Sequence, residues 1–374
     1  MKIVIASDSF KGTLSSLDIC HLFEDEMTKY PLLKGIYLPI ADGGEGSLDA
    51  ISYSIKGHYV PIVVKDPYFA EIPTKYYIDI DNNAYIETAS CAGLCLIRDL
   101  NPMNTTTYGL GQQVLDALKK GCKKIYIFLG GSATNDGGCG LFSALGTKFT
   151  NRRGEVFIPT GGTLKDIVSI DNSLTLALLK AVQIIGLCDV KNHLYGKSGA
   201  AYVYAPQKGA DEKMVKSLDE GLRTLARAIK KDLHKDIASV DSSGAAGGLG
   251  AGILAFGNGD LKSGIDTVLN LLNFAKVIRD ADFIISGEGK LDKQSFNGKV
   301  IQGIASRCQK ENKRLLLIVG ESEVSLGEAK KKYSCIEQIF ETNMNHLPFK
   351  KIQHSASAMY QEAVHRLLST IVNQ

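Results

Sequence analysis

Four glycine-rich segments of the sequence carry side chains that could bind phosphate, a metal ion and a small polar substrate. The richest is 130–138 (GGSATNDGG), which contains two hydroxyls, an amide and a carboxylate. The others are 8–12 (DSFKG), 42–46 (DGGEG) and 287–292 (GEGKLD), and Gly298-Lys299 follows the last of them. Because glycines let the backbone approach a ligand closely, the shared character of these segments predicts parts of one site.

Carboxylates and lysines in or near these segments would suit phosphoryl transfer. Mg²⁺ bound to nucleotide phosphates takes only one or two protein carboxylates, so other acids can position hydroxyls or accept a proton. Lysines would stabilise the charge on the phosphate oxygens. The acids are Asp8, Asp42, Glu45, Asp136, Asp189, Glu288 and Asp292, and the lysines are Lys11, Lys208 and Lys299.

Two features each have two open interpretations. Asp189 follows the apolar run 184–188, where a strand would hold its carboxylate rigidly as a general base or where it would cap the next turn. The segment 243–250 (SGAAGGLG), which contains Gly247 and Gly248, enters a predicted helix. Helix N-terminal amides favour an anion, and small residues also allow close helix packing.

The apolar runs around these segments predict the elements that position them. The two ends of the chain alternate between strand and helix, which is typical of a parallel sheet covered by helices on both faces. Predicted strands are 2–6, 35–40, 283–286 and 315–319, and predicted helices are 15–30, 47–55, 265–280, 297–309 and 354–372.

The middle of the chain follows a different pattern, with strands close together and a hairpin turn at 81–83. Predicted strands are 62–65, 75–81, 84–88, 125–129, 182–187 and 201–204, and a helix is predicted at 106–119. We therefore predict an α/β fold of two domains. Residues 1–64 and 266–374 form a parallel α/β domain, residues 65–265 form an inserted mixed-sheet α/β domain, and the expected site is the cleft between them.

Composition limits the function classes. A length of 374 residues favours two domains, and 44% hydrophobic with 22% charged residues is typical of a globular protein. The net charge of +3 is too small for a nucleic-acid partner. No apolar run suggests a leader or a membrane span, so we expect a cytoplasmic protein without a membrane partner. The eight dispersed cysteines are expected to be reduced thiols.

Familiar nucleotide motifs are incomplete. Gly196-Lys197-Ser198 resembles the end of a Walker A loop, but Lys191 stands where the first glycine belongs. The match to a dinucleotide fingerprint at 250–255 (GAGILA) has no strand before it.

Eight motifs, in this order, resemble the type I glycerate kinases, a bacterial family that phosphorylates glycerate with ATP. They are DSFKG (8–12), ADGGEG (41–46), TTTYG (105–109), GGSATNDGG (130–138), CDV (188–190), PQKGA (206–210), GAAGGLGAG (244–252) and GEGKLD…GK (287–299). The sequence departs from the family at Ser7, where proline is common, and at Asn192-His193, where Asn-Pro is common. Both positions affect the stiffness of a loop.

The resemblance implies one flavodoxin- or Rossmann-like domain and one domain built on a mixed sheet. It also implies ATP and Mg²⁺ as cofactors, D-glycerate as substrate, and a phosphoglycerate product, with 2-phosphoglycerate favoured over 3-phosphoglycerate. The assembly state is left open, with a homodimer as one option.

On this basis we hypothesise direct in-line transfer of the γ-phosphoryl group to a glycerate hydroxyl. Asp189 is the expected general base, and Lys11, Asp42 and Lys208 are the other catalytic candidates. Asp42 and Asp136 are the metal candidates. Substrate-binding candidates are Asp8, Ser9, Glu45, Ser132, Thr134, Asn135 and Asp136, and cofactor-binding candidates are Gly130, Gly131, Gly247, Gly248, Glu288, Asp292 and Lys299.

Two rival functions belong to other classes. A small-molecule sensor would use the same cleft without chemistry, and ligand-induced stabilisation without ADP release would favour it. A nicotinamide-dependent dehydrogenase of hydroxy acids is disfavoured by the lack of a GxGxxG segment between strand and helix near the N-terminus.

Overall fold

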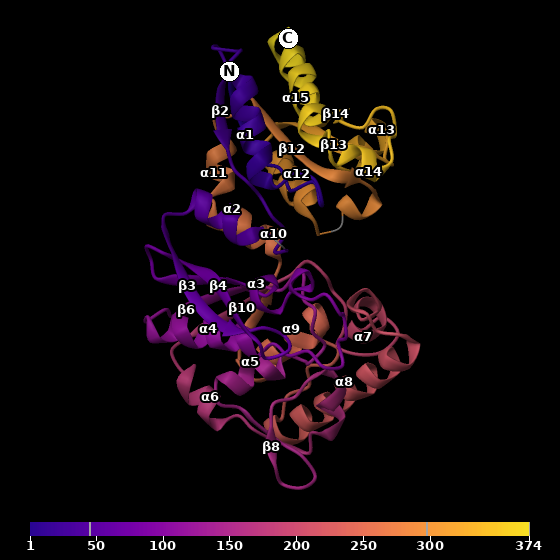
Figure 1. The fold of residues 1–374 in the computed structure, drawn as a ribbon. Helices are drawn as coiled ribbons and strands as arrows, with labels where there is room; N and C mark the ends of the chain where they lie inside the picture. The colour runs from indigo at the N-terminus through magenta and orange to yellow at the C-terminus, as the bar shows by residue number, and fades with distance from the viewer. Residues whose placement is uncertain (45, 297, 374) are drawn as a thin grey trace. The chain divides into compact units, whose positions relative to one another are not determined.

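The computed structural model describes residues 1–44, 46–296 and 298–373, and the chain divides into two compact units (Figure 1). The first unit comprises Met1–Asp42, Asp49–Ile55 and Gly264–Gln374, and the second comprises Gly43–Leu48 and Lys56–Ser263. Each unit is built around its own sheet.

The first unit contains a five-stranded parallel sheet in the order β14-β13-β12-β1-β2. The inner strand β1, which lies between β12 and β2, is apolar and fully buried at Ile3, Val4 and Ile5, as a strand covered on both faces must be. The strands are β1 (Lys2–Ile5), β2 (Lys34–Tyr37), β12 (Phe283–Leu291), β13 (Arg314–Ser322) and β14 (Ile336–Glu341).

Helices surround this sheet. The N-terminal helix α1 and the C-terminal helix α15 lie side by side and pack against Ile3 and Ile5 (Figure 1). A capping box fixes the start of α1, because Ser15 and Asp18 bond each other's backbone N–H. The helices of this unit are α1 (Ser16–Met27), most of α2 (Ser47–Ser54), α10 (Gly264–Leu271), α11 (Phe274–Ile278), α12 (Val300–Lys310), α13 (Leu326–Lys332), α14 (Phe349–Ile352) and α15 (Ala356–Val372), with a 3₁₀ turn η4 (Lys293–Phe296).

The second unit contains a six-stranded mixed sheet in the order β11-β10-β6-β5-β4-β3 and a small antiparallel sheet in the order β8-β7-β9. In the larger sheet β11, β10, β6 and β5 pair in parallel, and β4 pairs antiparallel with both β5 and β3. The strands are β3 (Gly57–Lys65), β4 (Glu71–Asp79), β5 (Asn83–Glu87), β6 (Lys124–Phe128), β7 (Lys148–Thr150), β8 (Val156–Phe157), β9 (Ser169–Asp171), β10 (Gln183–Leu187) and β11 (Asp260–Lys262).

The longest helix of the second unit, α8, begins at the Asp211 cap and buries one face that includes Leu218, Leu222 and Leu225. The helices are α3 (Ala89–Ala92), α4 (Tyr108–Lys119), α5 (Cys139–Ala144), α6 (Ser173–Leu178), α7 (Ala200–Tyr204), α8 (Glu212–Leu233) and α9 (Ala245–Ala255), with 3₁₀ turns η1 (Leu94–Leu96), η2 (Gly161–Asp166) and η3 (Pro206–Lys208).

The predicted fold class is confirmed: both chain ends build a parallel sheet, and the middle of the chain builds a mixed sheet. The inserted unit begins before residue 65, because β3 pairs with β4 along its whole length. The strand predicted at 201–204 is wrong, since these residues form α7, and the helix predicted at 265–280 is interrupted at the left-handed Asn273. None of the described helices is both long and apolar enough to cross a membrane.

Candidate functional site

In the first unit, three predicted acidic residues meet at one edge of the sheet. Asp8 follows β1, Asp42 follows β2, and Glu288 lies in β12. Backbone bonds join these segments beyond the strands, from Ile40 N–H to Ser7 O (3.2 Å) and from Asp8 N–H to Gly287 O (3.0 Å). Because these strands are parallel neighbours, their carboxyl ends lie together, where α/β sheets bind ligands.

This arrangement changes the acidity of two carboxyls. Burial raises the pKa of Asp8 to about 7, and the negative charges of Asp42 and Glu288 add to the effect. Burial also raises the pKa of Glu288. Glu288 is 7% exposed, and its Oε1 has no hydrogen-bond partner among the described residues. The edge therefore holds a carboxyl that titrates near neutral pH.

Basic and hydroxyl groups lie next to this acidic cluster. The Ser9 backbone N–H donates to Asp8 Oδ1 (2.7 Å), and the Ser9 hydroxyl lies at 3.4 Å from the same oxygen. Lys11 is exposed, and its charge lowers the pKa of Asp8. The charge of Lys299 likewise lowers the pKa of Glu288. Lys11 and Lys299 are thus cations that offset part of the acidic charge.

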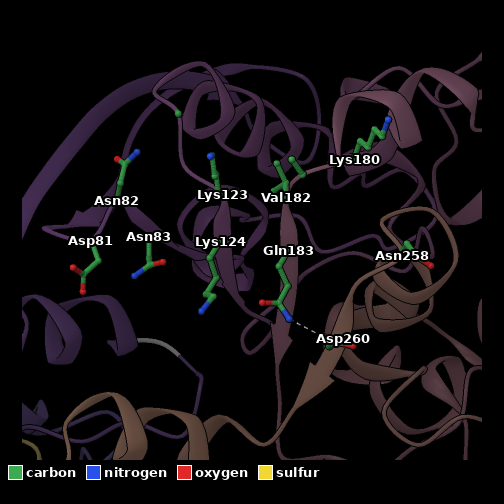
Figure 2. Close-up of a pocket in the computed structure, with 12 residues that line it drawn as sticks. Asp81, Asn82, Asn83, Lys123, Lys124, Lys180, Val182, Gln183, Asn258 and Asp260 are labelled. Carbon is green, nitrogen blue, oxygen red and sulfur yellow. Dashed lines mark hydrogen bonds between the residues drawn. The ribbon is translucent and has the colours of Figure 1, made fainter.

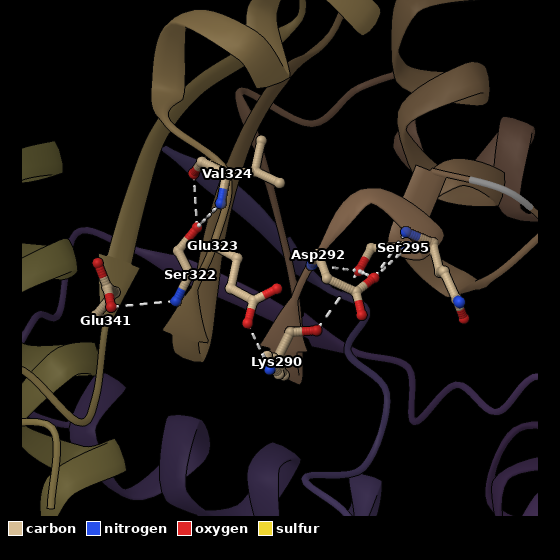
Figure 3. A network of polar contacts seen from close by, with 8 residues as sticks. Lys290, Asp292, Ser295, Ser322, Glu323, Val324 and Glu341 are labelled. Carbon is tan, nitrogen blue, oxygen red and sulfur yellow. Dashed lines mark hydrogen bonds and ion pairs between the residues drawn. The ribbon is translucent and has the colours of Figure 1, made fainter.

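The Asp292 side chain accepts hydrogen bonds within the turn that follows β12 (Figure 3). Its Oδ1 accepts from the backbone N–H groups of Gln294 (2.7 Å) and Ser295 (3.0 Å). Lys290, two residues earlier, pairs with Glu323 at 2.7 Å. The Asp292 carboxylate therefore has a local structural role in this turn.

In the second unit, the predicted loops also follow neighbouring parallel strands. The loop 130–136 follows β6, and Asp189 follows β10; the two strands continue in register, with a bond from Leu129 N–H to Leu187 O (3.1 Å). Gly130 lies against the segment 43–44, since its N–H donates to Gly43 O (3.1 Å) and a Cβ there would come within 2.5 Å of Gly44 Cα. Glu45, predicted to bind substrate, lies outside the described residues.

Asp136 is a fully buried acceptor for five donors. Its Oδ2 accepts from the Thr107 N–H and hydroxyl (both 2.8 Å), the Gly140 N–H (3.1 Å) and the Thr106 hydroxyl (3.4 Å), and its Oδ1 accepts from the Gly138 N–H (3.1 Å). Burial raises its pKa, and these hydrogen bonds oppose the rise. Asp136 therefore joins the loop to the start of α4, a link that sequence reasoning missed although it had noted the TTTYG motif.

Lys208 is a buried cation beside this loop. It is 2% exposed, and its Nζ donates to Ser132 Oγ (2.9 Å) and to the Thr134 carbonyl (2.7 Å). Burial lowers its pKa to about 7, whereas Asp136 acts in the opposite sense. The turn η3 holds Lys208 in place and ends at the left-handed Gly209.

Several polar atoms near the loop have no partner among the described residues. They are both side-chain polar atoms of Asn135 and the hydroxyls of Thr134 and Thr88. All three residues are 0% exposed, and Thr88 is tied to the end of β6 by a bond from its N–H to Phe128 O (3.0 Å). Sequence reasoning had named Asn135 and Thr134 but missed Thr88. Buried polar atoms normally have partners, so these atoms are candidates for contacts with a polar ligand.

Gly247 and Gly248 pack against the same loop. A Cβ on Gly247 would lie 2.0 Å from Thr134 O, and the Gly247 carbonyl accepts from the Gly137 N–H (3.1 Å). Ala246, Gly247 and Gly248 are consecutive left-handed residues at the start of α9. The close-packing interpretation therefore accounts for these glycines, and a contact with a cofactor stays a prediction, as it does for Gly130 and Gly131.

Asp189 is half-buried just beyond β10, and the Ser263 hydroxyl donates to its Oδ1 (2.7 Å). Ser263 follows β11, the neighbouring strand. A carboxylate held by a strand end and a hydroxyl has a defined position, as a general base requires.

Within residues 1–44, 46–296 and 298–373, no three His, Cys, Asp or Glu side chains form a metal-binding group. Magnesium that is bound through nucleotide phosphates does not need such a group, because one or two carboxylates are enough. The acidic edge of the first unit, with the unpartnered Glu288 Oε1, fits this requirement. Asp136 fits it poorly, since five donors occupy its oxygens.

A pocket of about 660 Å³ lies at the opposite, amino-terminal edge of the mixed sheet (Figure 2). Lys123, Lys124, Lys180, Asp81 and Asp260 are among its lining residues, and none of the predicted site residues is. Figure 2 shows Lys123 and Lys124 pointing in opposite directions. The charges of Lys123 and Lys124 therefore do not converge on one position.

Comparison with known proteins links this geometry to one family. The family described as "Glycerate kinase family" matches residues 3–372. A Bacillus cereus protein named glycerate kinase is 43% identical over 313 residues, which is 83% of this chain and 82% of that protein. Escherichia coli glycerate 2-kinase is 39% identical over 331 residues, 87% of each chain. A crystal structure described as a glycerate kinase 2 from Salmonella typhimurium LT2 has a TM-score of 0.85 at 34% identity and covers 100% of this chain and 98% of its own.

Proposed function

Because the chain belongs to the Glycerate kinase family, we propose that it transfers the γ-phosphoryl group of ATP to a hydroxyl of D-glycerate. Family membership confirms the resemblance and the enzyme class, a kinase. We further propose 2-phosphoglycerate as the product. This proposal is supported by the E. coli relative, whose name specifies a 2-kinase.

The observation that carries the proposal is the set of buried polar groups at the carboxyl edge of the second unit's sheet. A buried lysine, an amide and two hydroxyls lie on elements joined by direct hydrogen bonds, and the amide and hydroxyls lack partners among the described residues. A small acid with several hydroxyls would supply both the negative charge and the hydrogen bonds that these groups lack.

The first unit would contact phosphate and metal. Bound Mg²⁺ would neutralise charge on the nucleotide phosphates. We assign its protein contact to Asp42, with Glu288 as a further oxygen donor, and not to Asp136. Lys11 and Lys299 would bind phosphate oxygens, and Asp8 and Ser9 would hold the segment 8–12 in position through their mutual hydrogen bonds.

Asp189 would accept the proton of the attacking hydroxyl. A general base contributes roughly 10²- to 10⁴-fold to the rate, and the remaining acceleration would come from positioning and electrostatics, because the transition state of phosphoryl transfer is loose. The Ser263 hydroxyl would orient the Asp189 carboxylate through its 2.7 Å bond.

Phosphorus NMR of the reaction mixture tests this function. With ATP, Mg²⁺ and D-glycerate, the expected result is ADP together with one new phosphate monoester, coupled to the proton on C2. Glycerol in place of D-glycerate is the control. Ligand-induced stabilisation without any new ester would favour a sensor, and no change in any phosphorus signal would overturn the kinase assignment.

A further inference from the structure

The surroundings of Lys208 lack a counter-charge. The side chain is 2% exposed, and the hydrogen bonds that its Nζ makes to described residues go to uncharged oxygens. Two of the three ammonium N–H groups are used, by Ser132 Oγ and Thr134 O, which leaves one donor. A buried ammonium group without an adjacent anion is unfavourable, so this environment favours the neutral amine until an anion binds.

Asp136, whose charge acts on Lys208, does not pair with it directly. Asp136 acts on Lys208 through space, but its oxygens accept from Thr107, Thr106, Gly138 and Gly140. These bonds hold Asp136 within the loop, and no ion pair with Lys208 forms. The missing charge must therefore come from outside the described residues.

The neighbouring side chains indicate what kind of anion fits. Asn135 has an unpartnered acceptor and an unpartnered donor, and Thr134 has an unpartnered hydroxyl. The Thr134 backbone connects them to Lys208, because its carbonyl is bonded to Lys208 Nζ. An anion without O–H groups would use only the donors. An anion that also carries hydroxyl groups would use the acceptor as well.

We propose that Lys208, together with Asn135 and Thr134, is the recognition site for the carboxylate and adjacent hydroxyl of the acceptor, and that Lys208 makes the enzyme select a hydroxy acid over the corresponding alcohol. This inference rests on the proposed function, because it assigns the acceptor of that reaction. Lys208 is a substrate-binding residue in this scheme, and Asp136 positions the loop.

The kinetic test replaces Lys208 by methionine, which keeps the length of the side chain and removes its charge. A lost hydrogen bond to a charged group corresponds to about 10- to 100-fold in affinity. K208M should therefore raise the KM for D-glycerate by that factor, whereas the KM for ATP should stay within about threefold. A KM for D-glycerate that changes less than threefold would overturn the proposal.

The matched control is Lys180→Met, an exposed lysine of the same unit that lines the pocket at the opposite edge of the sheet. It should leave both KM values unchanged. If K180M raises the KM for D-glycerate as much as K208M does, the proposal is overturned. The effect would then reflect the net charge of the protein and not a specific contact.

A measurement on the unmodified protein keeps the proposal testable if K208M does not fold. Of the described titratable groups, Asp136 alone acts on Lys208, whose pKa of about 7 leaves it mostly neutral at pH 8. A bound carboxylate favours the ammonium form. Calorimetric titration with D-glycerate, repeated in two buffers of different ionisation enthalpy, should show uptake of about one proton per site.

Glycerol should cause no uptake under the same conditions. Binding of D-glycerate without proton uptake would contradict the role of Lys208. If the wild-type protein binds D-glycerate with uptake but forms no phosphate ester, the proposed function fails and the binding site stands. If it forms the ester and K208M behaves as wild type, the function stands and the inference fails.

Discussion

The two units present the same kind of sheet edge with different electrostatics. In the first unit three acids converge, and the pKa of Asp8 rises to about 7. In the second unit one carboxylate, Asp136, is surrounded by donors, and a buried lysine has its pKa lowered to about 7. In both units a glycine-rich loop follows a parallel strand, and the partners of each side chain distinguish the chemistry that each edge could support.

The largest expected effect is a loss of kcat, which should differ between substitutions in the two units. Asp189→Asn should lower kcat by roughly 10²- to 10⁴-fold, because the amide cannot accept the hydroxyl proton. Asp8→Asn in the first unit should lower kcat less near pH 7, since the carboxyl it replaces is about half protonated there. Steady-state assays of both variants with D-glycerate and ATP measure the difference.

Ser263→Ala is the control for Asp189→Asn, because it removes only the hydroxyl that bonds Asp189. It should cost less than about tenfold in kcat, well below the loss of a general base. A reversed order, with Asp8→Asn far more damaging than Asp189→Asn, would move the base to the first unit.

The next effect concerns stability. Asp136→Ala leaves the buried N–H groups of Thr107, Gly138 and Gly140 without their acceptor, and each such loss costs about 1–3 kcal/mol. We expect at least about 3 kcal/mol lower free energy of unfolding in chemical denaturation. Asp292→Ala, which removes a half-buried turn acceptor of the first unit, should cost only about 1 kcal/mol. Equal losses would contradict the contrast between the two carboxylates.

The third effect depends on pH. The pKa of Asp8 is about 7 in the folded protein against 3.8 without burial, so the folded state binds more protons between these values. The Asp8 contribution therefore lowers stability as pH rises from about 4 to 7 and is constant above that window. Asp8→Asn should raise the melting temperature at pH 8 and leave it almost unchanged at pH 4.

Asp292→Asn is the matched control for this pH dependence. Burial raises the pKa of Asp292, but hydrogen bonds from Gln294 and Ser295 outweigh that effect and lower it. The substitution should therefore destabilise the protein at pH 8, opposite in sign to Asp8→Asn. A lower melting temperature for both variants at pH 8 would show that the ionised Asp8 carboxylate does not destabilise the folded protein.

The smallest effect tests the backbone beside the loop. Ala246 has φ 53° and ψ 43°, a left-handed conformation that costs a residue with Cβ about 1 kcal/mol relative to glycine. Ala246→Gly should stabilise the protein by roughly 0.5 kcal/mol after the larger entropy of unfolded glycine is subtracted. Ala251→Gly, at a regular position of the same helix, should destabilise it, and stabilisation by neither change would argue against strain at Ala246.

Much of the first unit could be predicted from sequence, because β1, β12 and β13 contain buried apolar runs, although β14 and α13 were not predicted. The capping box at Ser15 and Asp18 defines the start of α1 locally. In the second unit, the sequence AAYVY was wrongly predicted to be a strand. It carries no local helical signal, and the helix α7 depends on its packing against α8. The small sheet β8-β7-β9 depends on pairing between short segments that carry no local pattern.

The candidate site shows the same division. Residue types marked the loops correctly as polar and glycine-rich, but they could not show that Asp136 is occupied by donors from Thr106 and Thr107, some thirty residues earlier in the chain. Burial of Lys208 and the unpartnered state of Asn135 also arise only from long-range packing. Sequence thus identified candidates, whereas their roles required the contacts.

Hydrogen–deuterium exchange with saturating D-glycerate, without nucleotide, tests most directly whether the second unit recognises the acceptor. We expect slower exchange in 130–136 and around Lys208, with the segments 8–12 and 287–292 little changed. Protection confined to 8–12 and 287–292 would place acceptor recognition in the first unit and contradict the contrast drawn between the two sheet edges.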